Sequence, residues 1–404
     1  MPMQDGGLRR PPGLRRAPEG RARPCVVSSG RLQRQSAGNG QGVQTDASEA
    51  ILTSPGRTRI CAYQGASAEI SRERKKMALL EVSNLGVSFD TDLGEVRAVR
   101  DVSFSVNQGE IFGIVGESGS GKSVSTRAIL RINPANARIT GGSVKFDGKE
   151  ILSLSEKEFM PYRGRRIAMI FQDSLTALNP VYTIGSKMSD LICQIEGTSR
   201  RDAAQKTLSL LAEVGIRDPE RCFRSYPHEL SGGMRQRVMI AMAVACSPDL
   251  IIADEPTTSL DVTIQAQILR LLRDIQRRRG CSVILITHDL GVVAQMCRRI
   301  SVMCGGYVVE TGTAEQIFHH PVHPYTQALI ASMPRADREF RPFLEHSVSR
   351  DRGRSAVGEK EDALCPFLDR CPAASAACRG TLPRVRAVEE EHTARCFADG
   401  KKED

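Results

Sequence analysis

Short apolar runs alternate with helical patterns along most of the chain, between residues 79 and 334. Residues 111–115, 250–253 and 282–287 have the length and the continuous apolar character of strands that are buried on both faces. Residues 123–131 have a helical pattern instead. Strands that alternate with helices in this way predict an α/β domain.

A second helical region is predicted inside this domain. In residues 186–215 the apolar side chains recur at the spacing of one face of a helix. We therefore expect a helical subdomain over about residues 174–232, within a larger domain that spans residues 77–334. Residues 335–364 are charged and irregular and predict a linker, which leads into a cysteine-rich tail at residues 365–404.

The first 76 residues differ in composition from the rest of the chain. They are rich in Arg, Gly, Ser, Pro and Gln, and they hold 14 Lys and Arg against 6 Asp and Glu. Such a composition buries too little apolar surface to offset the entropy of ordering, so we expect a disordered basic extension at residues 1–76. Met77 opens a strand-like segment, and we expect translation to begin there.

The net charge of +9 comes almost entirely from that extension, because the remaining residues hold 42 basic and 41 acidic side chains. This balance argues against nucleic acid as a partner. No apolar stretch approaches the ~18–20 residues of a membrane span, so any membrane role requires a partner. Most of the 12 cysteines stand alone in apolar segments, and no secretory signal is evident, which favours a reducing, cytosolic compartment.

A glycine-rich loop follows the first of the buried strands and opens the helical segment. Its pattern, Gly116-x-x-x-x-Gly121-Lys122-Ser123, is typical of a phosphate-binding loop in that context. Successive backbone N–H groups can turn toward phosphate oxygens there, and the helix N-terminus adds the positive end of its dipole. Lys122 is expected to neutralise the β- and γ-phosphates, and Ser123 to bind Mg²⁺. The residues expected around ATP are Gly116, Glu117, Ser118, Gly119, Ser120, Gly121, Lys122, Ser123 and Val124.

Polar side chains end three other predicted strands. Asp254 and Glu255 follow a buried strand, whose carboxyl end should lie beside the phosphate loop. Asp254 is expected to bind Mg²⁺, and Glu255 to act as general base on the water that attacks the γ-phosphorus. Gln172 is expected to reach the metal and that water, and His288 to bond the γ-phosphate. The predicted catalytic residues are thus Glu255, His288 and Gln172, and the predicted Mg²⁺ ligands are Ser123, Gln172 and Asp254.

A second anion-binding element is predicted at residues 230–236, Leu-Ser-Gly-Gly-Met-Arg-Gln. Ser231, Gly232 and Gly233 stand where a helix would begin, and a helix N-terminus favours anions. A single nucleotide rarely needs two such helix starts from one chain. We therefore expect two ATPase copies to face each other head to tail, each completing the other's site.

These motifs, in this order, resemble those of the ATPase subunit of ABC transporters over about residues 79–334. In that resemblance the Walker A loop is 116–123, the Q-loop residue is Gln172, the signature is 230–236, the Walker B strand is 250–255 and the switch histidine is His288. The resemblance implies an ABC-type P-loop NTPase fold with a helical subdomain, and ATP hydrolysis with ATP and Mg²⁺. It also implies that Asp261, in the D-loop 259–261, belongs to the ATP site in trans, and that Phe89 stacks on adenine.

A narrower resemblance points to the oligopeptide/dipeptide/nickel importer branch, in particular its D-type ATPase. Residues 171–181, 233–242, 260–268 and 320–326 carry it, whereas Ser174 stands where that branch usually has Pro. It implies uptake of di- or oligopeptides by a peripheral subunit at the cytoplasmic face of the inner membrane. The implied partners are two integral permeases, a second homologous ATPase and, indirectly, an extracytoplasmic solute-binding protein. An importer motor for nickel or another small solute, and a soluble ABC ATPase without a transport role, are the alternatives.

The tail contains Cys365, Cys371, Cys378 and Cys396. Four thiolates can bind tetrahedral zinc or an iron–sulfur cluster, and zinc ribbons favour close Cys-x2–4-Cys pairs that are absent here. Resemblance to the tail of D-type peptide-importer ATPases implies a [4Fe–4S] cluster on these four residues. Zinc and plain reduced cysteines stay open as alternatives. We expect His392 to lie beside the ligands or to be exposed, without being a ligand itself.

Overall fold

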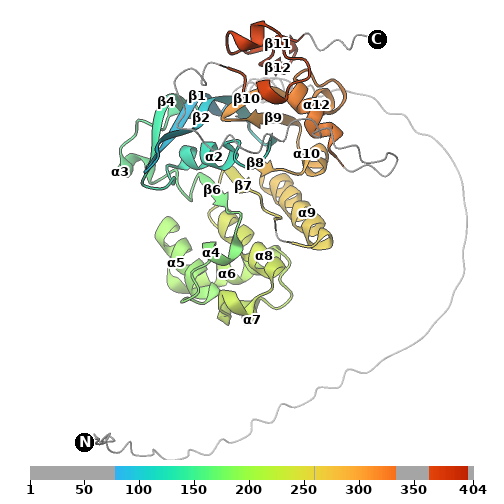
Figure 1. Cartoon of the computed structure of the whole chain (residues 1–404). Helices are drawn as coiled ribbons and strands as arrows, with labels where there is room; N and C mark the ends of the chain where they lie inside the picture. Colours follow the sequence, from blue (N-terminus) through green and yellow to red (C-terminus); the bar gives the residue numbers. More distant parts are fainter. Residues whose placement is uncertain (1–77, 259, 334–363, 399–404) are drawn as a thin grey trace, which may run out of the picture. The chain divides into compact units, whose positions relative to one another are not determined.

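The computed structural model describes residues 78–258, 260–333 and 364–398 (Figure 1), all of them within a compact unit that spans Cys61–Asp404. The predicted extension, the predicted start at Met77 and almost all of the predicted linker lie outside the described residues. So do Ser259 of the D-loop and residues 399–404 of the tail.

The described strands form one twelve-stranded sheet with an antiparallel part and a mostly parallel part. The antiparallel part contains β1 (Ala78–Thr91), β2 (Gly94–Asn107), β4 (Ala137–Phe146) and β5 (Lys149–Glu150). The parallel strands lie in the order β9 (Arg299–Cys304), β3 (Ile111–Val115), β8 (Ser282–Thr287), β7 (Leu250–Asp254) and β6 (Ile167–Ile170). Between the two parts, β10 (Tyr307–Thr313) pairs with β2 and runs antiparallel to β9.

The central strands β3, β7 and β8 are buried along their whole length. Successive side chains of a strand point to opposite faces of the sheet. In β3, Phe112 and Ile114 therefore pack with α2 (Lys122–Leu130) and the antiparallel strands. Ile111 and Val115 pack instead with the helices on the other face. Coverage on both faces explains the continuous apolar runs, and the predicted α/β fold is confirmed.

The remaining helices follow β5 or stand between the later strands. Those before β7 are α3 (Glu156–Phe159), α4 (Ser174–Ala177), α5 (Ile184–Glu196), α6 (Arg200–Glu213), α7 (Pro219–Arg224), the 3₁₀ turn η1 (Pro227–Glu229) and α8 (Gly232–Val244). Those after it are α9 (Val262–Arg279), α10 (Leu290–Met296), α11 (Ala314–His319) and α12 (Pro324–Ala331). No helix in the described parts of the chain is long and apolar enough to cross a bilayer.

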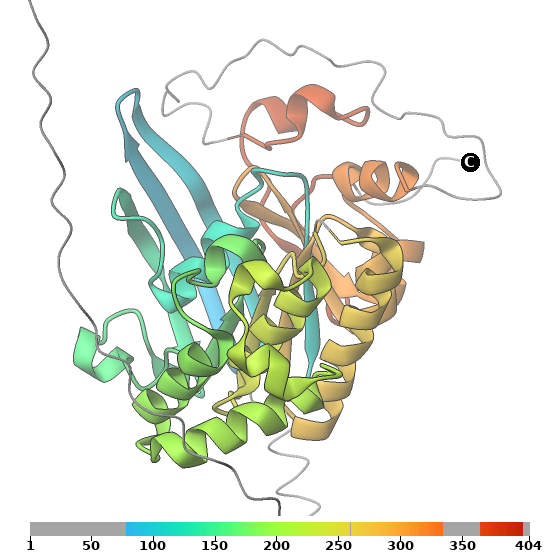
Figure 2. The same ribbon diagram turned by 90° about the horizontal axis from the view of Figure 1, so that it is seen from below.

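Helices α5 to α8 gather at one end of the sheet, as Figures 1 and 2 show. They pack through buried apolar faces, including Met188 of α5, Leu211 of α6 and Val238 of α8. Polar residues define where several of these helices begin: the side chains of Thr183 and Ser199 accept N–H bonds from the first turns of α5 and α6. Helical periodicity and capping residues thus separate this helical group from the sheet.

Residues 364–398 pack against the sheet through a short strand. β12 (His392–Ala394) pairs antiparallel with β10, and β11 (Arg386–Glu389) pairs with β12. Two 3₁₀ turns precede them, η3 (Leu368–Arg370) and η4 (Ala377–Arg379). Arg395 anchors this segment with an ion pair of 2.6 Å to Asp101 of β2. These strands are not predictable from the sequence, because they are too short to show an alternating pattern.

Candidate functional site

The glycine-rich loop curls from the end of β3 into the start of α2. Gly116 has φ +153, and a Cβ there would lie 2.2 Å from the Met303 carbonyl oxygen. Gly121 has φ +97 and caps α2. Both positions therefore require glycine. Glu117, Ser118 and Gly119 form the exposed tip of the loop, Ser120, Gly121 and Lys122 are buried, and Ser123 and Val124 are half-buried.

The loop holds the ammonium of Lys122 at its centre. Lys122 Nζ donates to the carbonyl oxygens of Gly116 and Glu117, each at 2.8 Å. Burial lowers the pKa of Lys122, and the carboxylates of Glu255, Asp254 and Glu117 act in the opposite direction. The ammonium of Lys122 is therefore surrounded by loop carbonyl groups, and nearby carboxylates favour its charged form.

Asp254 ends β7 and meets the start of α2. Ser123 Oγ donates to Asp254 Oδ1 at 2.6 Å, and Arg127 Nη2 lies 3.3 Å from Asp254 Oδ2. Burial raises the pKa of Asp254, while the bonds from Ser123 and Arg127 counteract the rise. A hydroxyl and a carboxylate that meet in this way supply the oxygen ligands that Mg²⁺ prefers. Arg127 was not predicted, because a single Arg within a helix carries no distinctive pattern.

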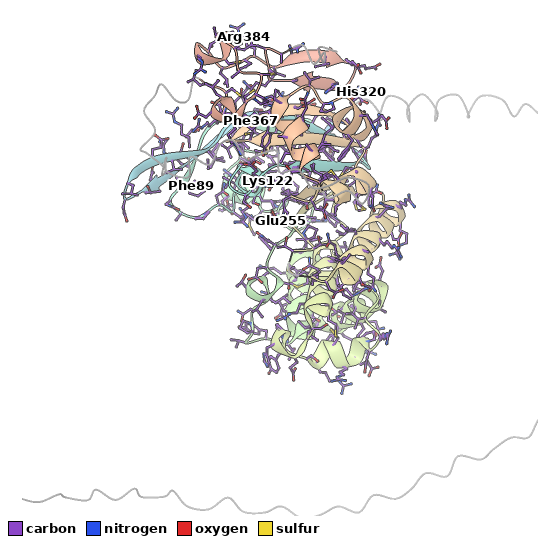
Figure 3. The ribbon with its side chains drawn as sticks, turned by 45° about the vertical axis from the view of Figure 1, so that its right-hand side comes forward. Phe89, Lys122, Glu255, His320, Phe367 and Arg384 are labelled. Atoms are coloured by element: carbon purple, nitrogen blue, oxygen red, sulfur yellow. The ribbon has the colours of Figure 1, made fainter. Side chains whose placement is uncertain are left out.

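Glu255 brings the other predicted catalytic residues together. Its Oε2 accepts bonds from Gln172 Nε2 at 3.1 Å and from Thr258 Oγ1 at 2.9 Å, and its Oε1 lies 3.4 Å from His288 Nδ1. Glu255 also has φ +46, an uncommon backbone conformation for a residue with a side chain. Such local strain concentrates at functional sites. In Figure 3 the labelled Glu255 lies close to Lys122.

The second anion-binding element lies apart from this cluster. Ser231 caps α8, where its side chain accepts from Met234 N at 3.3 Å, and it is followed by the half-buried Gly232 and Gly233. Asp261 caps α9 in the same way, accepting from Ile264 N at 3.0 Å. Within the described residues, no hydrogen bond or ion pair joins this element or Asp261 to the glycine-rich loop.

Phe89 lies on β1, where it is half-buried and pairs across the ladder with Val96 of β2. Figure 3 shows it on the side of Lys122 toward the β1–β2 hairpin. Phe89 thus belongs to the antiparallel part of the sheet, and not to the glycine-rich loop.

The four cysteines of the tail line one cavity of about 130 Å³. Cys365, Cys371 and Cys396 each receive a backbone N–H bond from the residue two positions further along. Burial raises the pKa of Cys365 to about 11, and the other three thiols add to the rise. Among the described residues, no group of three or more His, Cys, Asp or Glu is arranged to hold a metal ion as it stands.

Two buried histidines, one at this cavity and one away from it, have different roles. His323 lines it: its Nδ1 accepts from Tyr325 N at 3.0 Å, which leaves the proton on Nε2, 3.9 Å from Cys365 Sγ. Burial lowers the pKa of His323 to about 4. His392 is buried elsewhere and donates from Nε2 to Glu310 Oε1 at 2.8 Å. His392 is therefore not exposed, and that alternative is wrong, because the pairing of β12 with β10 carries it into the interior.

Two residues outside the predicted set contact the glycine-rich loop. Tyr325 accepts a bond from Glu117 N at 2.9 Å through its hydroxyl, and Arg370 forms two bonds to the Glu117 carboxylate, at 3.0 and 3.2 Å. Tyr325 stands in the segment 320–326, which in sequence supported only a family resemblance. Nothing in the sequence around Arg370 indicates this contact, since it joins positions far apart in the chain.

Comparison with known proteins identifies two family models. The model described as ABC transporter matches residues 99–258, and that described as the C-terminal region of oligopeptide/dipeptide transporters matches residues 309–378. The second match covers most of β10, all of α11 and α12, and three of the four tail cysteines.

Among curated proteins, the chain is 48% identical to a probable peptide ABC transporter ATP-binding protein of Sinorhizobium fredii, over 79% of this chain and 94% of that protein. It is 46% identical to the dipeptide transport ATP-binding protein DppD of Bacillus subtilis, over 80% and 96% of the two chains. Among solved structures, it is similar to the ATP-binding cassette MJ0796, a dimer in a post-hydrolysis state bound to ADP and Pi. That match has a TM-score of 0.52 and 29% identity, over 58% of this chain and 98% of the cassette.

Proposed function

Because this chain belongs to the family of ATP-binding subunits of ABC transporters, we propose that it is the ATP-hydrolysing subunit of an importer for di- or oligopeptides. The observation that carries this proposal is the convergence of residues from four strand ends. Lys122 and Ser123 follow β3, Asp254 and Glu255 lie at the end of β7, and Gln172 and His288 follow β6 and β8.

Each residue of this cluster has a distinct role in the proposal. The glycine-rich loop and Lys122 bind the phosphates, and Ser123, Gln172 and Asp254 hold Mg²⁺, which neutralises phosphate charge when bound. Glu255 accepts the proton of the attacking water, and Gln172 orients that water. His288 bonds the γ-phosphate from its exposed position. The strained backbone of Glu255 and the bonds from Gln172 and Thr258 support this reading, since they fix the direction of its carboxylate.

The site is completed in trans. Ser231, Gly232 and Gly233, with Asp261, contact the nucleotide bound to a second ATPase, and Phe89 stacks on the adenine bound to this chain. Support comes from the exposed helix start at Ser231, which has no bond to its own phosphate loop among the described residues. The similar cassette MJ0796 is itself a dimer. The second ATPase is a homologous subunit, which makes the pair a heterodimer.

The surface around α4 is the proposed docking site for two integral permeases. Phe171, Leu175, Val181 and Tyr182 are large apolar side chains that are all exposed here, next to Gln172. A motion of Gln172 on ATP binding therefore reaches this surface directly. In this arrangement the chain is a peripheral subunit at the cytoplasmic face of the membrane, and a solute-binding protein on the other side delivers the peptide.

Cys365, Cys371, Cys378 and Cys396 are proposed to bind a [4Fe–4S] cluster. The cavity that they line and the N–H bonds to three of their sulfurs support this, because such bonds stabilise thiolate ligands. The spacing of the four cysteines lacks the close Cys-x2–4-Cys pairs that zinc ribbons favour, which argues for a cluster over zinc. Elemental analysis of anaerobically purified protein should find about four iron atoms per chain. Zinc in place of iron would contradict the cluster.

Glu255→Gln tests the ATPase function. Gln keeps the size and shape of Glu255 but cannot take a proton, so hydrolysis should fall by about 10²–10⁴-fold. ATP binding should stay near that of the wild type, as measured with a fluorescent ATP analogue. Glu315→Gln, on the exposed surface of α11, is the matched control and should hydrolyse ATP normally. Normal turnover by Glu255→Gln would show that Glu255 is not the general base.

A further inference from the structure

The cysteine-rich segment reaches the tip of the phosphate loop through one side chain. Arg370 ends η3, directly before Cys371, and its two guanidinium nitrogens bond the two carboxylate oxygens of Glu117. This two-pronged geometry is the strongest form of an Arg–carboxylate pair. Phe367 of the same segment is labelled in Figure 3, on the side of Lys122 toward the tail.

Aromatic rings hold Arg370 in this position. Its guanidinium lies 5.1 Å from the centre of the Phe367 ring and 6.0 Å from that of Tyr325. Phe367 is fully buried, and the two rings meet edge to face at 5.3 Å. Contacts of this kind between a cation and aromatic faces are attractive. The Tyr325 hydroxyl also accepts the N–H of Glu117, so both ends of this residue are fixed from outside the loop.

The negative charge of Glu117 is unfavourable in a loop that binds an anion. Glu117 stands between Gly116 and Ser118 at the tip of the loop, and its charge acts to raise the pKa of Lys122. An unpaired carboxylate there would repel phosphate groups at short range. Arg370 is the cation that pairs with it among the described residues. Pairing therefore removes a repulsive charge and sets the direction of the Glu117 side chain.

We propose that Arg370 is a positioning residue of the ATP site, which neutralises and orients Glu117 so that the phosphate loop accepts ATP. The inference rests on the proposed function, since it assumes that the loop binds ATP. It makes the docking of the cysteine-rich segment a condition for tight nucleotide binding. The segment is thereby part of the ATP site, although none of its residues is expected to touch the nucleotide.

The test compares Arg370→Gln with the double variant Glu117→Gln/Arg370→Gln in the full-length chain. Titration with a fluorescent ATP analogue should show that Arg370→Gln weakens binding by roughly 3–10-fold, because removing one partner leaves an unpaired charge. The double variant has no unpaired carboxylate, so its affinity should return to within about 2-fold of Glu117→Gln alone. Arg384→Gln is the matched control. Arg384 is exposed in the same segment, and within the described residues its side chain has no hydrogen bond or ion pair.

Two outcomes would overturn the inference. One is an Arg370→Gln variant that binds ATP as Arg384→Gln does. The other is a double variant as weak as Arg370→Gln, which would mean that the substitution only damages the fold of the segment. Steady-state kinetics add a second readout, in which Arg370→Gln should raise KM for ATP with little change in kcat. If the wild type itself neither bound nor hydrolysed ATP, the proposed function would fail instead.

Discussion

Glu310 holds the tail and the start of α12 to the sheet, and its removal should have a large effect on stability. It lies on β10, is 1% exposed, and accepts three bonds: from Val322 N at 2.8 Å, from His323 N at 3.0 Å and from His392 Nε2 at 2.8 Å. These donors come from the segment before α12 and from β12. One buried carboxylate thus joins three parts of the chain.

The size of the effect follows from what Glu310→Ala would leave behind. Two backbone N–H groups and a buried imidazole N–H would lose their acceptor, and each buried donor left unsatisfied costs about 1–3 kcal/mol. For a domain of this size, about 1 kcal/mol moves Tm by about 2–4 °C, so three such donors should lower Tm by at least about 6 °C. Glu310→Gln keeps one acceptor oxygen, so its Tm should fall less than that of Glu310→Ala.

Differential scanning fluorimetry of the purified chain measures this directly, with Glu315→Ala as the exposed control on α11. Limited proteolysis adds a local readout, because release of β12 should expose the tail to cleavage before the rest of the domain unfolds. A Glu310→Ala variant that melts with the control, or whose tail is no more sensitive to protease, would refute the reasoning.

Three further predictions concern the site. Asp254→Asn should raise Tm at pH 7 and abolish hydrolysis: burial raises the pKa of Asp254, so its ionised form costs stability above that pKa. The gain should shrink as pH falls below the raised pKa and vanish below the ordinary pKa of an aspartate, where the wild type is protonated both folded and unfolded. Equal Tm values at pH 7 would contradict it. Ser231→Arg should retain ATP binding by the chain alone but stop hydrolysis in the assembled importer, because Ser231 acts on the partner's nucleotide. Normal turnover by that variant would argue against the trans site. Cys371→Ser should weaken ATP binding by about the same factor as Arg370→Gln, roughly 3–10-fold, and adding it to Arg370→Gln should give no further loss. An additive loss would show that Cys371 and Arg370 affect ATP binding independently of each other.

Much of the fold was predictable because its signals are local. Residues 111–115 and 250–253 carry no polar side chain because helices and strands cover both of their faces, and such runs are visible in sequence. The helical group was visible through its periodicity in residues 186–215. The strands β11 and β12 were not, because their pairing with β10 depends on tertiary contacts and involves only a few residues.

The residues of the site also fall into those that local sequence signals predict and those that they do not. Lys122, Asp254 and Glu255 could be predicted because the end of a parallel strand determines where the next residue lies, and motif spacing encodes that position. Their bonding partners Arg127 and Thr258 were missed, although both are close in sequence to predicted residues. Arg370 was missed for a different reason. Its contact joins the tail to the phosphate loop, and no periodicity or motif records such a distance.

The contacts of the tail change how the ATP site is defined. The phosphate loop is supported from behind by the β9–β10 turn, where Gly306 N donates to Ser120 O at 3.1 Å. It is supported at its tip by Tyr325 and Arg370. The same turn packs on the tail, since a Cβ at Gly305 would lie 2.6 Å from Pro366 Cβ. Loop, turn and tail are therefore in mutual contact. A change in the order of the tail must alter at least one support of the loop, which is why cysteine and arginine variants in the tail are expected to affect nucleotide affinity.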